Sequence, residues 1–232
     1  MKTNALSQFL LPATLAAVAA LFAGCGTTSG YKQADKTGAG IAEYRAEVVR
    51  VKLAVDDALS SLDQIQLTAS TNPRKAYERF TTSVKNLDKV AAKAQARGAE
   101  MKAQGQAYFA QWEQQLSQVK NQEIRKLAEE RRAKLLEAFD GIKAIAEPLK
   151  SQFDPWLSDL KDLQNYLGND LTIAGVDAAK KLFVKARSDG AEVEKSIDAL
   201  MTELNSIAAT LTPANLPPTP PEKPPTGSSS GS

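Results

Sequence analysis

The sequence of 232 residues contains no histidine and only one cysteine, and aromatic residues make up only 6% of it. Histidine is the commonest general base in enzymes and a common zinc ligand, so its absence argues against acid–base catalysis and against a zinc site. A lone cysteine forms no disulfide within the chain. We therefore expect a protein that is not an enzyme and that has no catalytic residues, no metal site and no cofactor.

An excess of charge of one sign is also lacking, because 29 basic residues nearly balance 27 acidic ones. The two signs alternate in residues 123–137, which is typical of a solvent-exposed helix face and gives no case for binding nucleic acid. Carboxylate pairs at helical spacing, Asp159 with Asp162 and Glu129 with Glu130, lie among lysines and arginines. A narrow helical bundle offers them no cleft, so we expect no small-molecule substrate.

The N-terminal segment has the organisation of a bacterial export signal. Its apolar run over residues 9–22, about 14 residues long, is too short to span a bilayer of roughly 30 Å. Residues 21–25 (LFAGC) resemble the bacterial lipobox, although a phenylalanine stands where leucine is usual. We therefore predict that residues 1–24 are a signal peptide and that Cys25 is lipidated and anchors the protein to a membrane. Gly26 after the cysteine favours the outer membrane, with the protein facing the periplasm.

Composition divides the rest of the chain into three segments. Residues 25–40 are rich in small and polar residues without an apolar period, which predicts a flexible tether after the lipidated cysteine. Residues 41–211 carry apolar side chains at heptad spacing, which predicts a helical bundle domain. Residues 212–232 are rich in proline, serine, threonine and glycine, which predicts a disordered tail.

The apolar stripes predict about four long helices, over residues 41–65, 73–112, 124–167 and 176–211. Asn72 and Thr172 are expected to cap helices, Pro148 to kink the third helix, and Asp154 to begin it afresh. Short connections require antiparallel neighbours, so the predicted fold is an all-α, elongated, up-and-down bundle with coiled-coil-like packing.

The two middle helices are longer than the outer two, so the hairpin at residues 117–122 should project from the bundle. The first helix starts toward the same end, and we expect the hairpin to point at the membrane.

Gly98, Gly105 and Gly190 lie on the stripes, where each costs about 1 kcal/mol relative to alanine. Close packing of a partner helix backbone is the expected reason for these glycines, and a hinge is the alternative.

An aromatic cluster near the predicted hairpin is the main candidate surface. Tyr108 and Trp112 fall on the apolar stripe of the second helix, whereas Phe109 lies off it. Core packing would account for all three rings. The alternative is that Phe109 is exposed and forms a contact surface for a membrane or a partner.

Several stretches carry a resemblance to a known family: residues 36–45 (KTGAGIAEYR), 105–113 (GQAYFAQWE), 166–180 (YLGNDLTIAGVDAAK) and 185–200 (KARSDGAEVEKSIDAL). They resemble bacterial lipoproteins of a coiled-coil family catalogued as a domain of unknown function, family 2959. The resemblance covers about residues 37–213. It implies a lipoprotein signal and coiled-coil helices, and it implies no activity, cofactor or catalytic residue.

These observations favour a non-enzymatic envelope lipoprotein that acts as a helical spacer, scaffold or protein-interaction module. Its partners would be the membrane, through the lipid on Cys25, and envelope proteins that the sequence does not identify. The alternative is a lipid-handling or membrane-active bundle whose amphipathic helices open. The apolar stripes can be satisfied within one chain or between chains, so a monomer and an oligomer both remain open.

Overall fold

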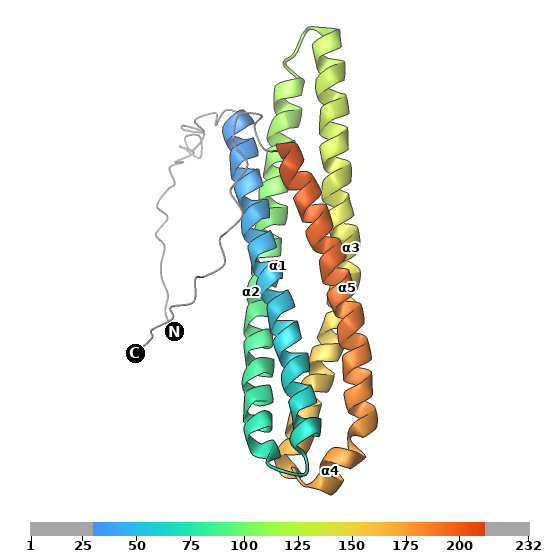
Figure 1. Cartoon of the computed structure of the whole chain (residues 1–232). Helices are drawn as coiled ribbons and strands as arrows, with labels where there is room; N and C mark the ends of the chain where they lie inside the picture. Colours follow the sequence, from blue (N-terminus) through green and yellow to red (C-terminus); the bar gives the residue numbers. More distant parts are fainter. Residues whose placement is uncertain (1–29, 212–232) are drawn as a thin grey trace, which may run out of the picture.

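The structure is a computed structural model that describes residues 30–211. In that range the helices are α1 (Gly30–Thr68), α2 (Pro73–Leu116), α3 (Gln122–Asn169), α4 (Ile173–Ala178) and α5 (Lys180–Leu211). The four long helices α1, α2, α3 and α5 form an elongated bundle, and the short α4 crosses one end of it (Figure 1). The predicted all-α bundle is confirmed.

Ion pairs fix the direction and order of the helices. Glu43 near the start of α1 pairs with Arg97 in the second half of α2 at 3.1 Å, and Asp57 pairs with the earlier Arg79 at 2.8 Å, so the two helices are antiparallel. Each long helix contacts two others, in the cyclic order α1, α2, α3, α5. The arrangement is therefore an up-and-down bundle in which sequential neighbours lie side by side.

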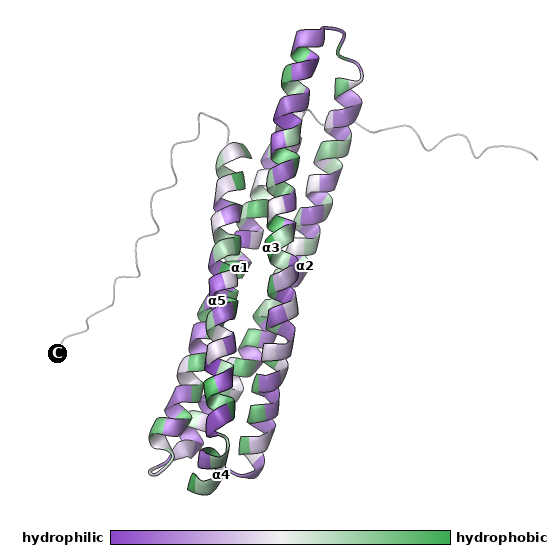
Figure 2. Ribbon diagram, turned by 90° about the vertical axis from the view of Figure 1, so that its right-hand side faces the viewer, coloured by the Kyte–Doolittle hydropathy of each residue, from purple (hydrophilic) through white to green (hydrophobic). Residues whose placement is uncertain are grey.

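The apolar stripes meet along the axis of the bundle and form one core. In Figure 2, hydrophobic and hydrophilic residues alternate along each helix, as expected for helices that bury one face. The largest fully buried side chains come from all four long helices: Trp156, Phe80, Phe183, Ile41, Leu62, Ile65, Leu87, Leu160, Leu167, Ile197, Leu200 and Leu204. Burial of each contributes about 1.5–3 kcal/mol relative to exposure, which offsets the ordering of long helices.

Helix α1 begins at Gly30, so the prediction of a flexible tether over residues 25–40 is wrong from Gly30 onward. Ala34 is partly buried and Thr37 fully buried, and both extend the stripe that continues at Ile41. The Thr37 hydroxyl donates to the carbonyl of Gln33 at 2.8 Å, which satisfies it inside the core. Ala34 and Thr37 thus fill core positions although neither is a large apolar residue.

Helix α3 continues through two prolines, so the predicted fresh start at Asp154 is wrong. Proline has no N–H and displaces the carbonyl four residues earlier, which usually ends a helix. Pro148 and Pro155 both lie on the exposed face of α3, where water can bind the released carbonyls. Asp154 pairs with Lys150 one turn before it and does not cap a helix.

The last stripe is divided between two helices. Thr172 caps α4 as predicted, since its hydroxyl oxygen accepts from the Gly175 N–H at 3.0 Å. A break at Ala179 then separates α4 from α5, although Ala179 and Phe183 are both buried on the predicted register. Asn72 precedes α2 at the predicted cap position, but its side chain makes no capping hydrogen bond.

The connection between α2 and α3 projects from the bundle, as predicted. We call residues 117–128 the hairpin tip. The outer turns of α2 and α3 extend past the start of α1 and the end of α5 (Figure 1). Leu211 at the end of α5 lies beside Gly38 of α1, so the described chain enters and leaves the bundle at the hairpin-tip end. We call the opposite end, where α1 meets α2 and α4 lies, the far end.

Candidate functional site

Cavities open along the contact between α2 and α3. Asp88 and Lys161 close it toward the far end with an ion pair of 2.9 Å, and Glu113 and Arg132 close it toward the hairpin tip at 3.0 Å. Between these pairs the two helices stand apart and leave cavities along their contact. We call this stretch the α2–α3 groove.

The largest cavity of the groove has a volume of about 590 Å³. Two aromatic rings, those of Tyr44 and Phe139, lie against glycines of α2 on its wall. A Cβ on Gly98 would stand 3.1 Å from the Tyr44 ring, and one on Gly105 would stand 2.6 Å from the Phe139 ring. The two glycines therefore make room for aromatic rings, so the prediction of close backbone packing is wrong at Gly98 and Gly105.

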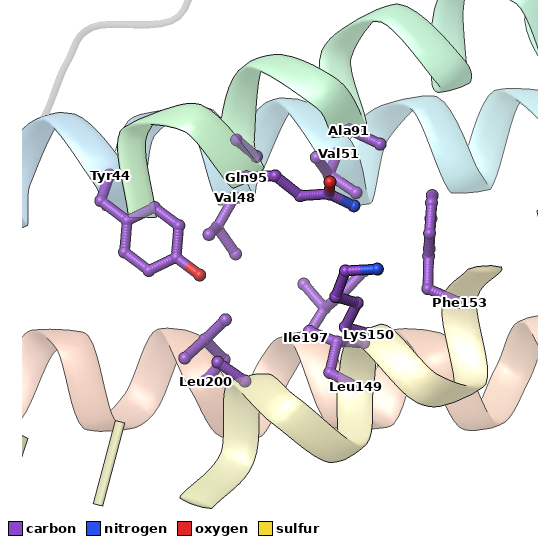
Figure 3. Close-up of a pocket in the computed structure, with 12 residues that line it drawn as sticks. Tyr44, Val48, Val51, Ala91, Gln95, Leu149, Lys150, Phe153, Ile197 and Leu200 are labelled. Carbon is purple, nitrogen blue, oxygen red and sulfur yellow. The ribbon is translucent and has the colours of Figure 1, made fainter. Parts of the chain in front are cut away.

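A smaller chamber of about 90 Å³ continues the groove into the core (Figure 3). Its walls are apolar and come from all four long helices, including Val48 of α1 and Leu200 of α5. Gln95 of α2 and Lys150 of α3 line both this chamber and the larger cavity, and they point toward one another across the gap in Figure 3. The core is thus reached from the surface between these two polar side chains.

Charged side chains lie along the rim of the groove. Lys102, Lys143 and Lys150 contribute positive charge, while Asp140 and Glu147 contribute negative charge. Lys143 lies 3.8 Å from Glu147 on the same helix. An apolar interior with a mildly basic rim suits a ligand that has a hydrocarbon chain and an anionic head.

Tyr44 is a buried titratable side chain that lines both cavities of the groove. Burial raises the pKa of its hydroxyl above the ordinary value of 10.0, so the group stays neutral at physiological pH. A neutral phenol can donate a hydrogen bond to a ligand but supplies no charge. The groove is therefore equipped for binding through shape and apolar contact.

The hairpin tip is held by its own hydrogen bonds. The Asn121 side chain accepts from the N–H groups of Glu123 and Ile124 at 2.9 and 3.1 Å and caps α3. Arg125 Nη2 donates to the carbonyl of Val119 at 2.7 Å and ties the loop to the helix. The tip is thus a formed element that presents defined side chains.

Apolar side chains are exposed at both ends of the bundle. At the hairpin tip Ile124 is 55% and Leu127 67% exposed. The apolar stripe of the predicted helix over residues 124–167 begins at Ile124 and continues at Leu127 or Ala128. The far end exposes more, and its exposed apolar residues are Leu67, Ile173, Leu182 and Val184. We call these four residues the far-end patch. Sequence reasoning overlooked both ends, because a stripe does not reveal where its partner helices stop.

The structure corrects the predicted contact surface at Phe109. This residue is only 6% exposed, and its ring packs edge-to-face on Phe139 of α3 at 5.3 Å between centroids. Tyr108 is also buried and Trp112 is partly buried, so the cluster belongs to the core. Because α2 packs against both α1 and α3, its buried face is wider than one heptad stripe and includes Phe109.

The other sequence-predicted positions carry no site in the part of the chain that the structure describes. Cys25, the predicted lipidation site, lies outside the described residues. Asp159 pairs with Lys185 at 2.6 Å, while Asp162, Glu129 and Glu130 are exposed on outer faces. Within residues 30–211 no group of acidic or thiol side chains is arranged to hold a metal ion. None of the helices in that range is apolar enough over sufficient length to cross a bilayer.

A family model described as protein of unknown function (DUF2959) matches residues 30–211. The chain belongs to this family. The DUF2959 match begins at the first residue of α1 and ends at the last residue of α5, so it covers the whole described bundle. It includes the α2–α3 groove, the hairpin tip and the far-end patch. No curated protein and no solved structure matches this DUF2959 chain.

Proposed function

We propose that this DUF2959 protein is a non-enzymatic envelope lipoprotein whose bundle acts as a spacer and scaffold. In this proposal residues 1–24 are removed, Cys25 carries the lipid, and the bundle extends from the outer membrane into the periplasm. Because α1 begins at the hairpin-tip end, a lipid shortly before Gly30 attaches the bundle by that end. The far end then stands away from the membrane.

The observation that carries the proposal is the far-end patch. Its four side chains are between 50% and 72% exposed, and they come from the end of α1, the start of α4 and the start of α5. Leu182 and Val184 flank the buried Phe183 on opposite sides of α5, so the four side chains surround the far end of the bundle. Apolar side chains exposed around one end favour a partner that caps that end. Helix α2 has 44 residues and rises about 66 Å, which is roughly the distance from the patch to the anchored end.

Photocrosslinking in intact cells tests the scaffold role. Benzoylphenylalanine in place of Leu182 should form adducts with another envelope protein. The matched control is the same substitution at Leu53, a 63% exposed leucine in the middle of α1. Equal yields of adduct at the two positions, or none at Leu182, would contradict a partner surface at the far end.

Mass spectrometry of the mature N-terminus tests the anchor separately. The expected N-terminal peptide begins at Cys25 and carries a diacylglycerol on its thiol. A bare thiol, or a peptide that still contains residues 1–24, would show that the protein is not held by a lipid.

The α2–α3 groove favours a second candidate function, the handling of lipids. Its volume of about 590 Å³ lies within the range of small-molecule pockets, and its apolar walls and lysine rim suit one acyl chain with an anionic head.

Binding of a fluorescent fatty acid tests this second function, and the full chain should bind it. Ala146 lines both cavities, so Ala146→Phe should reduce binding at least tenfold, while Ala144→Phe on the exposed face of α3 should not. Unchanged binding in both variants would reject the groove as the site.

A further inference from the structure

The hairpin tip stands well beyond the point where α1 begins. Gly30 lies beside Gln115 near the end of α2, since a Cβ on the glycine would stand 3.2 Å from Gln115 Oε1. Near the same level, Glu113 of α2 pairs with Arg132 of α3 at 3.0 Å. Residues 122–131 of α3 lie past this level, and ten helical residues rise about 15 Å. The tip therefore projects about 15 Å past the first turn of α1.

The chain between Cys25 and Gly30 is too short to lift the bundle away from a membrane. Only four residues separate these two positions. Five steps of fully extended chain reach at most about 18 Å, which nearly equals the projection of the tip. A lipid on Cys25 holds that residue at the membrane interface. A linker that spans about 15 Å or less along the bundle axis therefore brings the tip to the membrane surface.

We propose that the hairpin tip is a second membrane contact, which binds the anionic headgroups of the bilayer that holds the lipid on Cys25. This inference rests on the anchor in the proposed function. With this second contact the bundle meets the membrane at two points, the lipid and the tip. A lipid alone would leave the bundle loosely tethered. Two separate contacts with the same membrane surface orient the bundle, and the far-end patch then points away from that surface.

The chemistry of the tip fits an anionic membrane surface. Ile124 and Leu127 lie one turn apart on α3 and are more than half exposed, so both can enter the headgroup region. The charges of the tip are mostly positive, and they belong to Lys120, Arg125, Lys126 and Glu123. Each cation near an anionic surface strengthens binding about fivefold, and Glu123 opposes them within the tip. Glu129 and Glu130 lie farther along α3, next to Arg131 and Arg132. Apolar groups flanked by cations are typical of interfacial helices.

Photocrosslinking to lipid tests the inference on the full mature protein. Benzoylphenylalanine is placed at Leu127, at Leu53 in the middle of α1, or at Ile173 at the far end, where the native residues are 67%, 63% and 61% exposed. The lipidated protein is inserted into vesicles of phosphatidylethanolamine with one quarter phosphatidylglycerol. Irradiation followed by mass spectrometry measures phospholipid adducts. We expect at least fivefold more adduct at Leu127 than at either control.

Each outcome decides the proposal. Equal adduct at Leu127 and Leu53 means that the bundle lies flat on the bilayer, and no adduct at Leu127 in vesicle-bound protein means that the tip stays away from it. Either result overturns the inference and leaves the anchor intact. A protein adduct at Leu127 in cells without lipid adduct makes the tip a protein-binding surface and also overturns it.

The anchor can fail independently of the tip. If protein from cells carries a bare Cys25, the same crosslinking is done after that thiol is coupled to a maleimide lipid, so that the tip is still judged. Lys120→Gln with Lys126→Gln removes two exposed cations and should lower the Leu127 adduct roughly 25-fold in anionic vesicles. Phosphatidylcholine vesicles should give the same low yield with and without these substitutions. A yield that does not depend on charge would overturn the choice of anionic headgroups.

Discussion

Gly190→Ala tests whether the glycines of the bundle serve close packing or bending. Gly190 lies in α5, where a Cβ would stand 2.9 Å from Leu59 and 3.1 Å from Trp156. Trp156 is only 1% exposed and its Nε1 donates to the Ala186 carbonyl at 2.8 Å, so the ring cannot move aside freely. Replacing a helical glycine by alanine gains about 1 kcal/mol, whereas overpacking a core costs about 1–3 kcal/mol. We expect a net destabilisation of about 1 kcal/mol.

Gly141→Ala is the matched control on α3. Its Cβ would meet only the end of the Glu203 side chain, at 3.1 Å from Oε1, and this partly exposed carboxylate can turn away. The helical gain should therefore dominate and stabilise the protein by about 0.5–1 kcal/mol. Urea unfolding followed by circular dichroism at 222 nm measures both variants. Stabilisation by both substitutions would refute the packing explanation and revive a hinge at Gly190.

Two further predictions concern the hairpin tip and the contact between α1 and α2. Asn121→Ala removes the cap of α3 and should cost about 1 kcal/mol, seen as faster hydrogen exchange of the Ile124 amide with little change in the far half of the bundle. Glu47 is buried, and hydrogen bonds from Arg50 and Lys93 lower its pKa below the ordinary 4.5. The stability it contributes is present above that value and is lost as the pH falls through the lowered pKa. Glu47→Gln should be less stable near pH 7 and should lose less stability on acidification, as measured by urea midpoints.

Much of the fold followed from apolar periodicity. The breaks at residues 68–72 and 117–122 are visible in the sequence because polar residues interrupt the stripes there, and helix lengths predict which hairpin projects. The start of α1 was predicted too late because Ala34 and Thr37 fill core positions without being large or apolar. Heptad spacing also passes through Ala179, so it does not reveal the break between α4 and α5.

The candidate sites were harder to predict because they depend on which helices are neighbours. Phe109 is buried because α3 lies beside α2 at that level, and a single stripe does not describe contacts with two neighbours. Ile124 and Leu127 are exposed because neither the start of α1 nor the end of α5 reaches their level. The α2–α3 groove depends on how far apart α2 and α3 lie, which apolar periodicity does not predict. In the sequence, the glycines that lie opposite Tyr44 and Phe139 indicate this region.

The entry and exit of the chain at one end of the bundle determine how it would respond to tension. A pull between the proposed lipid before α1 and a partner bound at the far end would act along the helix axes and load the contacts of α1 and α5 in shear. To yield, antiparallel neighbours would have to slide past each other, which displaces buried side chains along their whole length together. Peeling a helix sideways would release them one turn at a time. The bundle should therefore be mechanically strong along its axis and weak across it.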